Sequence, residues 1–168
     1  AGIVCTTSKI DKNNVIDYLN FPERIYPVGR LDKESTGLLL LTNNGQLMDD
    51  ILRGSNYHEK EYIVHVNKPI TDSVLQAMAQ GVPILDTITR PCKIRRMGKD
   101  CFYITLTQGL NRQIRRMCEY FDYRVTSLKR IRIMNIELGS LPVGKWRELT
   151  TSEIKTLKNL AQNKGEAE

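Results

Sequence analysis

The chain has 168 residues, of which 40% are hydrophobic and 26% charged, as expected of one globular domain or two small lobes that share a core. No apolar run approaches the roughly 20 residues of a membrane span, and no signal-peptide pattern opens the sequence. The four cysteines form no CxxC pair and, with two histidines, offer no zinc spacing. We therefore expect no metal site and reduced thiols in a cytoplasmic protein.

Basic residues outnumber acidic ones, 25 to 19, which gives a net charge of +6. They recur in three clusters in the second half of the chain, within residues 90–99, 112–116 and 124–132. Such clusters can build a basic face that follows a phosphate backbone. The alternative is a set of solvated strand and helix faces.

The first half of the chain predicts short strands and helices in turn. The predicted strands are 2–7, 37–42 and 60–66, and the predicted helices 13–20, 45–54 and 71–81. "GLLLLT" (37–42) lies between a glycine and Asn-Asn-Gly, which makes it too short for a helix and favours a central strand. "KEYIVHV" (60–66) alternates, with Tyr62, Val64 and Val66 on one face.

The second half predicts paired strands at 87–96 and 101–107, a strand over 124–138, and helices over 111–121 and 150–162. In the helix 111–121, Ile114, Met117, Cys118 and Phe121 form an apolar stripe, and the opposite stripe carries Arg112, Arg115, Arg116 and Glu119. Thr150 and Glu153 have capping-box spacing. Strands and helices mix without regular βαβ alternation, so we predict the α+β class with a mixed sheet.

Three arginines near the start of the helix 111–121 are locally unfavourable, because helix amino ends carry partial positive charge. Either they extend into solvent, or an anion lies there, which can be a carboxylate from elsewhere in the fold or a phosphate. Gly109, just ahead of this helix, allows another backbone or a ligand to approach closely.

"PVGRLDKESTGLLLLTNNG" (27–45) places Asp32 between Arg30 and Lys33, ahead of the leucine run. This pattern is typical of a solvated turn before a buried strand. A carboxylate at the edge of such a strand can also act chemically, and an arginine beside it would favour its charged form, as a nucleophile requires. Tyr62 has two interpretations as well: core packing, or a flat face on which a nucleobase stacks.

"GRLDKESTGLLLLTNNG", "HEKEYIVHV" and "QGLNRQIRRM", in this order, closely resemble motifs of the pseudouridine synthases that modify ribosomal RNA. The similarity is to the branch with the small-subunit enzyme and the large-subunit enzymes B, E and F, and "HEKEY", "VPIL" and "QGLNRQIRRMCE" are most similar to the F type. It covers the chain from Gly2 to about Leu157.

The resemblance implies an α+β fold with a mixed, mostly antiparallel sheet, flanking helices and an active site in a central basic cleft. The family's catalytic aspartate falls on Asp32, its base-stacking tyrosine on Tyr62, and the arginine that pairs with the aspartate on Arg115, with Arg112 as the second choice. The resemblance further implies RNA-binding roles for Arg30, Arg112, Gln113 and Arg116.

It also implies an isomerase that converts a uridine of ribosomal RNA, of the 23S type, into pseudouridine, with neither metal nor organic cofactor. We expect a cytoplasmic monomer whose catalytic domain is 1–160, followed by a polar tail, 161–168. Family members usually begin with an S4-like RNA-binding domain and a "KPxG" motif, of which only "AG" is found here. The alternative function is a non-catalytic RNA-binding or ribosome-assembly module. A metal-dependent nuclease lacks the clustered acids it would need.

Overall fold

The computed structural model describes residues 14–53 and 57–162, so the predicted strand 2–7 lies outside the described residues. The helices are α1 (Val15–Leu19), α2 (Gly45–Leu52), α3 (Asp72–Gln80), α4 (Gln113–Tyr120) and α5 (Thr151–Gln162). The strands are β1 (Tyr26–Pro27), β2 (Thr36–Gly37), β3 (Leu41–Thr42), β4 (Lys60–Val66), β5 (Pro83–Ile84), β6 (Thr87–Ile88), β7 (Lys93–Arg96), β8 (Cys101–Leu106), β9 (Val125–Ile133) and β10 (Ile136–Glu137).

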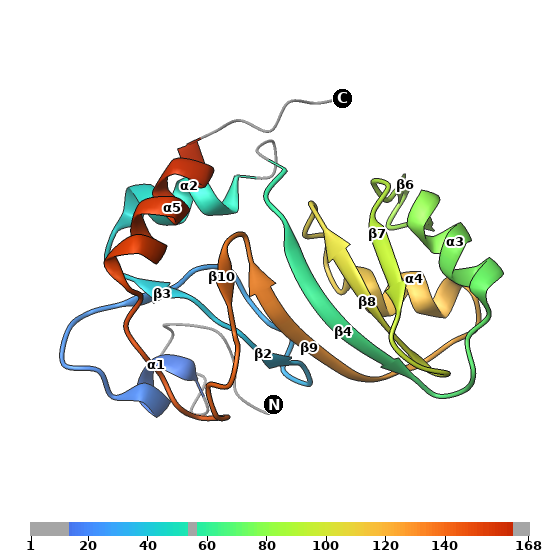
Figure 1. Cartoon of the computed structure of the whole chain (residues 1–168), viewed down its shortest axis with the longest axis horizontal. Helices are drawn as coiled ribbons and strands as arrows, with labels where there is room; N and C mark the ends of the chain where they lie inside the picture. The colour runs from blue at the N-terminus through green and yellow to red at the C-terminus, as the bar shows by residue number, and fades with distance from the viewer. Residues whose placement is uncertain (1–13, 54–56, 163–168) are drawn as a thin grey trace.

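The main sheet has the order β10-β9-β4-β8-β7, and these neighbours are antiparallel. The short strand β2 joins the same sheet through a parallel pairing with β9. The long strands β4 and β9 cross the middle of the molecule, with α3 and α4 at one end and α2 and α5 at the other (Figure 1). The predicted α+β class with a mixed, mostly antiparallel sheet is therefore confirmed.

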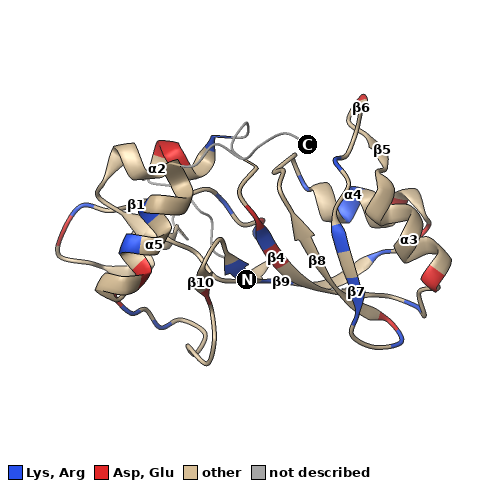
Figure 2. Ribbon diagram, turned by 45° about the horizontal axis from the view of Figure 1, so that its top comes forward, with Lys and Arg blue, Asp and Glu red and all other residues tan. Residues whose placement is uncertain are grey.

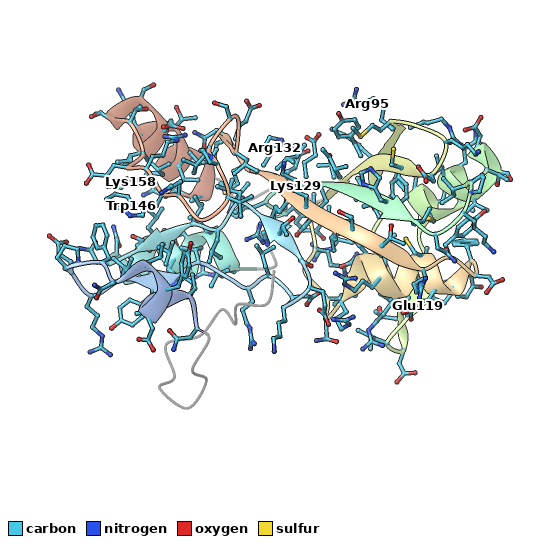
Figure 3. The ribbon with its side chains drawn as sticks, turned by 90° about the horizontal axis from the view of Figure 1, so that it is seen from below. Arg95, Glu119, Lys129, Arg132, Trp146 and Lys158 are labelled. Carbon is cyan, nitrogen blue, oxygen red and sulfur yellow. The ribbon has the colours of Figure 1, made fainter. Side chains whose placement is uncertain are left out.

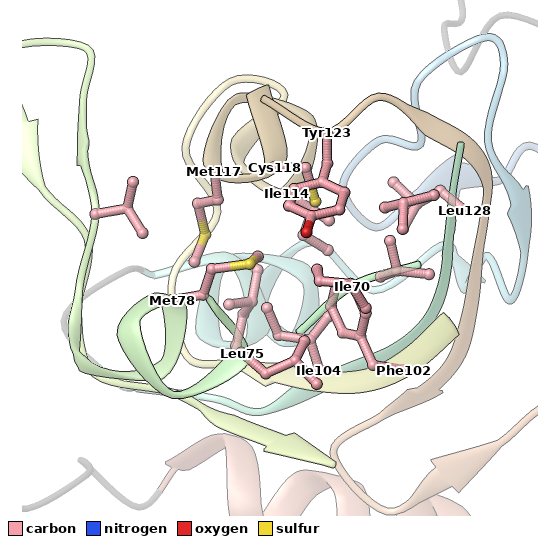
Figure 4. Close-up of a cluster of buried hydrophobic side chains, with 14 of the residues drawn as sticks. Ile70, Leu75, Met78, Phe102, Ile104, Ile114, Met117, Cys118, Tyr123 and Leu128 are labelled. Atoms are coloured by element: carbon pink, nitrogen blue, oxygen red, sulfur yellow. The ribbon is translucent and has the colours of Figure 1, made fainter. Parts of the chain in front are cut away.

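Two hydrophobic clusters stabilise the two ends of the sheet. The first lies between the sheet and helices α3 and α4, where side chains from the helices meet Phe102 and Ile104 of β8 (Figure 4). Val64 and Val66 of β4 belong to this cluster, and Tyr62 packs against it, which confirms the predicted face of β4. The second cluster joins α2 and α5 to the leucine segment and the end of β9.

The single strand predicted over 37–42 is wrong. Gly37 ends β2, Leu38 still donates its N–H to the carbonyl of Arg130 at 2.8 Å, and the chain then leaves β9. Leu41 and Thr42 form β3 with β1 instead. Leu38 and Leu40 are buried in the second cluster, so the leucine run crosses from one sheet to another.

Two other strand predictions are also wrong in extent. Residues 87–88 form β6, which folds back on β5 through Leu85 and Asp86, both at positive φ, so that β7 begins only at Lys93. The segment 124–138 is a hairpin rather than one strand, because Met134 adopts φ 53° and β10 returns along β9. Non-glycine residues rarely adopt such angles, and sequence patterns give little warning of them.

The helices agree with their predicted positions. Thr71 caps α3 with its side chain, and Gly81 ends that helix at φ 123°. α4 begins at Gln113, two residues later than predicted, because Arg112 adopts the left-handed conformation at its amino end. α5 extends to Gln162 and buries Ala161, so the helix continues into the segment expected to be the tail.

The predicted capping box of α5 is confirmed and includes an arginine. Glu153 accepts a hydrogen bond from the N–H of Thr150 at 2.9 Å, and Thr150 Oγ1 accepts one from the N–H of Glu153 at 3.1 Å. The guanidinium of Arg147 donates to both oxygens of Glu153, at 2.7 and 2.8 Å. These contacts, the Arg147 hydrogen bonds first, lower the pKa of Glu153 to about 2 from 4.5.

Because the folded-state pKa of Glu153 is depressed, its contribution to stability is present above pH 4.5 and is lost as the pH falls toward 2. Glu153→Gln is expected to lower the free energy of unfolding at neutral pH and to weaken its decline across that acidic window. Urea denaturation at a series of pH values measures both effects, with the exposed Glu148→Gln as control. An unchanged acid dependence in Glu153→Gln would refute the assignment.

Candidate active site

Asp32 lies in a turn immediately before β2. The N–H of Ser35 donates to the carbonyl of Asp32 at 2.9 Å, which closes the turn. The side chain of Asp32 is 29% exposed, whereas Ser35 is buried. The predicted turn is confirmed, and it presents the carboxylate at the point where the chain enters the sheet.

Arg115 of α4 contacts this carboxylate. Its Nε lies 3.4 Å from Asp32 Oδ2, and its Nη2 donates to Ser35 Oγ at 3.1 Å. The side chain of Arg115 is only 11% exposed, and its Nε makes an ion pair with Asp32 without hydrogen-bond geometry. For Arg115, the interpretation that an anion lies at the start of this helix is confirmed, and the anion is the Asp32 carboxylate from elsewhere in the fold.

Arg112 lies outside this pair, at the amino end of α4. Its Nη1 is 3.9 Å from Asp32 Oδ2 and 3.3 Å from Glu34 Oε2. The pKa of Glu34 is lowered, first by a hydrogen bond between its carboxylate and the backbone of the same residue, and then by the hydrogen bond from Arg112. The side chain of Arg112 is 40% exposed, so Arg115 is the closer and more deeply buried partner of Asp32.

Tyr62 is tied to the aspartate turn through the sheet. Arg130 of β9 is in register with Gly37 of β2 on one side and with Tyr62 of β4 on the other. Tyr62 is half-buried and packs against the first hydrophobic cluster. Two strand spacings therefore separate the end of the aspartate turn from the tyrosine.

Gly37 makes the close approach of β2 to β9 possible. A Cβ at this position would overlap the backbone of Arg130, including its carbonyl oxygen, and Gly37 adopts φ 111°. Only glycine meets both requirements. The glycine of "STG" thus holds the aspartate turn against the sheet.

The four residues predicted to bind RNA differ in accessibility. Arg30 and Arg112 are exposed, and Arg116 folds back to donate to the carbonyl and the side chain of Asn111, each at 3.0 Å. Gln113 is 4% exposed, and its amide binds Leu110, Gln108 and Met117. These contacts support the loop before α4, and an RNA contact of Gln113 stays a prediction.

Three residues near the site were not singled out from the sequence: Ser35, Lys60 and Arg130. Ser35 could have been found from its position between Asp32 and Gly37, where a small polar side chain can support a turn. Arg130 shares the strand face of the buried Leu128, and Lys60 that of Tyr62, because side chains on a strand alternate. In the sequence, Arg130 was considered only as part of the basic cluster 124–132.

Basic residues are distributed over several elements, including β7 and α4 (Figure 2). Lys129 and Arg132 of β9 and Arg95 of β7 lie along the sheet (Figure 3). Arg132 is neutralised by Glu59 and Glu61, each at 3.1 Å. The central basic cleft implied by the resemblance stays a prediction.

Within residues 14–53 and 57–162, no three His, Cys, Asp or Glu side chains group together as ligands of a metal ion. In the same ranges, no helix combines the length and apolar character needed to cross a bilayer.

The chain is similar to known proteins in both sequence and structure. Residues 1–120 match the family model described as RNA pseudouridylate synthase. The chain is 54% identical over 161 residues to the dual-specificity RNA pseudouridine synthase RluF of Salmonella typhi, and 52% over 162 residues to that of Escherichia coli K12. Each alignment covers 96% of this chain and 56% of the relative, so the chain spans little more than half the length of these proteins.

Two further similarities cover more of the matched proteins. The ribosomal large subunit pseudouridine synthase B of Bacillus subtilis is 34% identical over 169 residues, covering 95% of this chain and 69% of that protein. A crystal structure of a pseudouridylate synthase has a TM-score of 0.85 and 31% identity, covering 93% of this chain and 69% of that one.

Proposed function

Because this chain belongs to the RNA pseudouridylate synthase family, we propose that it isomerises a uridine of ribosomal RNA to pseudouridine. The family resemblance predicted from the motifs is thereby confirmed, while the activity of the whole protein is our proposal. The observation that carries it is the Asp32–Arg115 ion pair, which joins the "GRLD" and "RQIR" motifs across 3.4 Å. Asp32, Tyr62 and Arg115 are the proposed catalytic residues.

In the proposed reaction, Asp32 attacks the target nucleotide or assists cleavage of its N-glycosidic bond. The freed uracil turns, C5 bonds to C1′, and the ring loses the C5 proton while N1 gains one. Arg115 supplies the positive charge that compensates the carboxylate in a partly buried turn. The Tyr62 ring provides a surface on which the base stacks.

The target base must leave its stack in folded RNA, at a cost of a few kcal/mol. Contacts between cations and phosphates offset that cost and make binding dependent on salt. The exposed Arg30 and Arg112, with Arg116, are the residues we assign to the RNA around the flipped nucleotide. We therefore expect these arginines to contribute to RNA affinity, and the largely buried Arg115 to contribute to the rate of the reaction.

The finer features of this proposal follow the relatives. The Bacillus subtilis relative is named for the ribosomal large subunit, which supports a 23S-type RNA substrate. A monomer acting in the cytoplasm, with residues 1–160 as the catalytic domain, completes the proposal. The alternative, a non-catalytic RNA-binding module, is disfavoured because the aspartate and both of its arginine partners are present and in contact.

The test is to incubate the protein with a large-subunit ribosomal RNA transcript and to map pseudouridine by carbodiimide modification and primer extension. We expect one or a few specific carbodiimide-dependent stops, absent without protein. RNA binding that weakens steeply between low and moderate salt would support the basic contacts. Salt-sensitive binding without any product would favour the non-catalytic alternative.

A further inference from the structure

Lys60, the first residue of β4, lies at the site on the tyrosine's side of the sheet. It precedes Tyr62 by two residues, so the two side chains share a face. A Cβ built on Gly109 would lie 3.9 Å from Lys60 Nζ, which places the ammonium beside the loop that leads into α4. The side chain of Lys60 therefore extends from β4, the strand that carries Tyr62, toward the loop that carries Arg112.

The positive charge of Lys60 is not compensated within the described part of the chain. No acidic side chain there lies within ion-pair distance of it, although Glu59 and Glu61 on either side of it in sequence are both paired with Arg132. Lys60 is half-buried, and this burial, with a smaller effect from the charge of Arg130, lowers its pKa. A cation in this position raises the free energy of the empty site.

Arg130 places a second cation on the same face, in register with Tyr62. It is only 3% exposed; its Nε donates to the carbonyl of Leu38 at 2.9 Å, and its Nη2 is buried without a hydrogen-bond partner. Two neighbouring cations, one of them almost wholly buried, are costly unless a ligand supplies negative charge or hydrogen-bond acceptors. The structure thus indicates an acceptor-binding site next to Tyr62.

The burial of Lys60 and Arg130 indicates which part of the substrate they contact. Phosphates remain at the surface, within reach of exposed arginines such as Arg30. A flipped base enters further and stacks on Tyr62 in the proposed function, and uracil offers two carbonyl oxygens as acceptors. We propose that Lys60, next to Arg130, binds a carbonyl oxygen of the flipped uracil and stabilises the negative charge on the ring when the glycosidic bond breaks. This inference rests on the proposed function.

The charge arises whichever first step Asp32 performs. When the C1′–N1 bond breaks, its electron pair goes to the uracil, and N1 and the two oxygens share the negative charge. This holds if the carboxylate attacks C1′ and equally if it removes a proton from C2′. C5 then bonds to C1′ as the bond between Asp32 and C1′ breaks or, in the second route, as Asp32 returns the proton to C2′. Loss of the C5 proton and uptake of one proton at N1 give a neutral product, so no further reactant is needed. A fixed cation at the oxygen lowers the barrier to cleavage.

Lys60→Met in the full-length protein tests this role. We expect the single-turnover rate constant for uridine consumption to fall by ~10²–10³-fold, with the Kd for RNA within about threefold of wild type, because the contact strengthens only as charge develops. Lys158→Met, at an exposed position on α5 (Figure 3), is the matched control and should retain the wild-type rate.

A transcript with 5-fluorouridine at the target separates a chemical role from a structural one. Fluorine stabilises the uracil anion, so cleavage depends less on Lys60, and the loss caused by Lys60→Met should shrink by about tenfold at a pH where N3 stays protonated. Nuclease digestion and chromatography measure consumption of the target nucleotide in both substrates. Lys60→Gln, which keeps a polar chain, gives the same comparison if Lys60→Met does not fold.

Three outcomes overturn the inference. A wild-type rate in Lys60→Met refutes the role of the lysine alone and leaves the proposed function standing. Equal losses on both transcripts, or a loss confined to Kd, assign Lys60 to structure or to phosphate binding. An inactive wild-type protein overturns the proposed function and this inference together.

Discussion

Replacing Asp32 with asparagine is expected to lower the single-turnover rate of pseudouridine formation by ~10⁴-fold or more, the scale of loss when a covalent nucleophile is removed. Asparagine has nearly the shape of aspartate but neither its charge nor its nucleophilicity. The turn should persist, because it is closed by the main-chain hydrogen bond from Ser35 to Asp32 at 2.9 Å. The Kd for RNA and the melting temperature should therefore change little.

Asp49→Asn, on the exposed surface of α2, is the matched control for the same chemical change. It should retain the wild-type rate, as measured by quenched reactions on the same transcript and carbodiimide mapping. Pseudouridine formation by Asp32→Asn at a rate near that of the wild type would show that the catalytic assignment is wrong. The non-catalytic alternative would then be the better account of the site.

Replacing Arg115 with methionine is expected to reduce the rate by ~10²–10³-fold while changing the Kd for RNA by no more than about threefold. Arg115 is 11% exposed and contacts Asp32 and Ser35, so its charge is directed at the carboxylate rather than at a phosphate. Methionine preserves the apolar part of the side chain within α4. Asp32 would lose the partner that orients it.

For Arg30→Met we expect the opposite, a loss of affinity rather than of rate, because Arg30 is exposed and is proposed to bind the RNA. Its removal should weaken binding and reduce the slope of log Kd against log salt by about 1, with a smaller effect on the rate at saturating RNA. Filter binding at several salt concentrations and single-turnover assays measure the two effects separately. Equal losses of affinity and rate in Arg115→Met would make Arg115 a phosphate contact instead.

The fold was predictable wherever local patterns agree with the tertiary structure. β4 has the predicted bounds, Lys60–Val66, because alternation along it matches one buried face. α3 begins after Thr71 and ends before Gly81, because caps act within a single turn of the chain. The leucine segment was mispredicted because hydrophobicity shows burial but does not say which sheet receives the residues.

The candidate site was predictable only in part, for a related reason. Asp32, Tyr62 and Arg115 were identified through motifs that resemble a family, and the acid, the aromatic ring and the basic helix start could each be seen locally. The burial of Gln113 could not be seen from its motif, because its neighbours there are arginines, whereas its own position on α4 faces the core. A motif identifies residues, but helix orientation decides which of them a substrate reaches.

The family, the α+β class and the turn at Asp32 could be predicted from the amino-acid sequence alone, whereas it left open whether an anion lies at the start of α4. These depend on neighbours within a few residues or on motif order. The packed structure added that Arg115, the first choice from the motifs, is closer to Asp32 and more deeply buried than Arg112. It alone brought Lys60, Gly109 and Arg130 together, because strand pairing joins segments that are far apart in the chain. The energy of a charge depends on what surrounds it in space, and that is set by the packed fold.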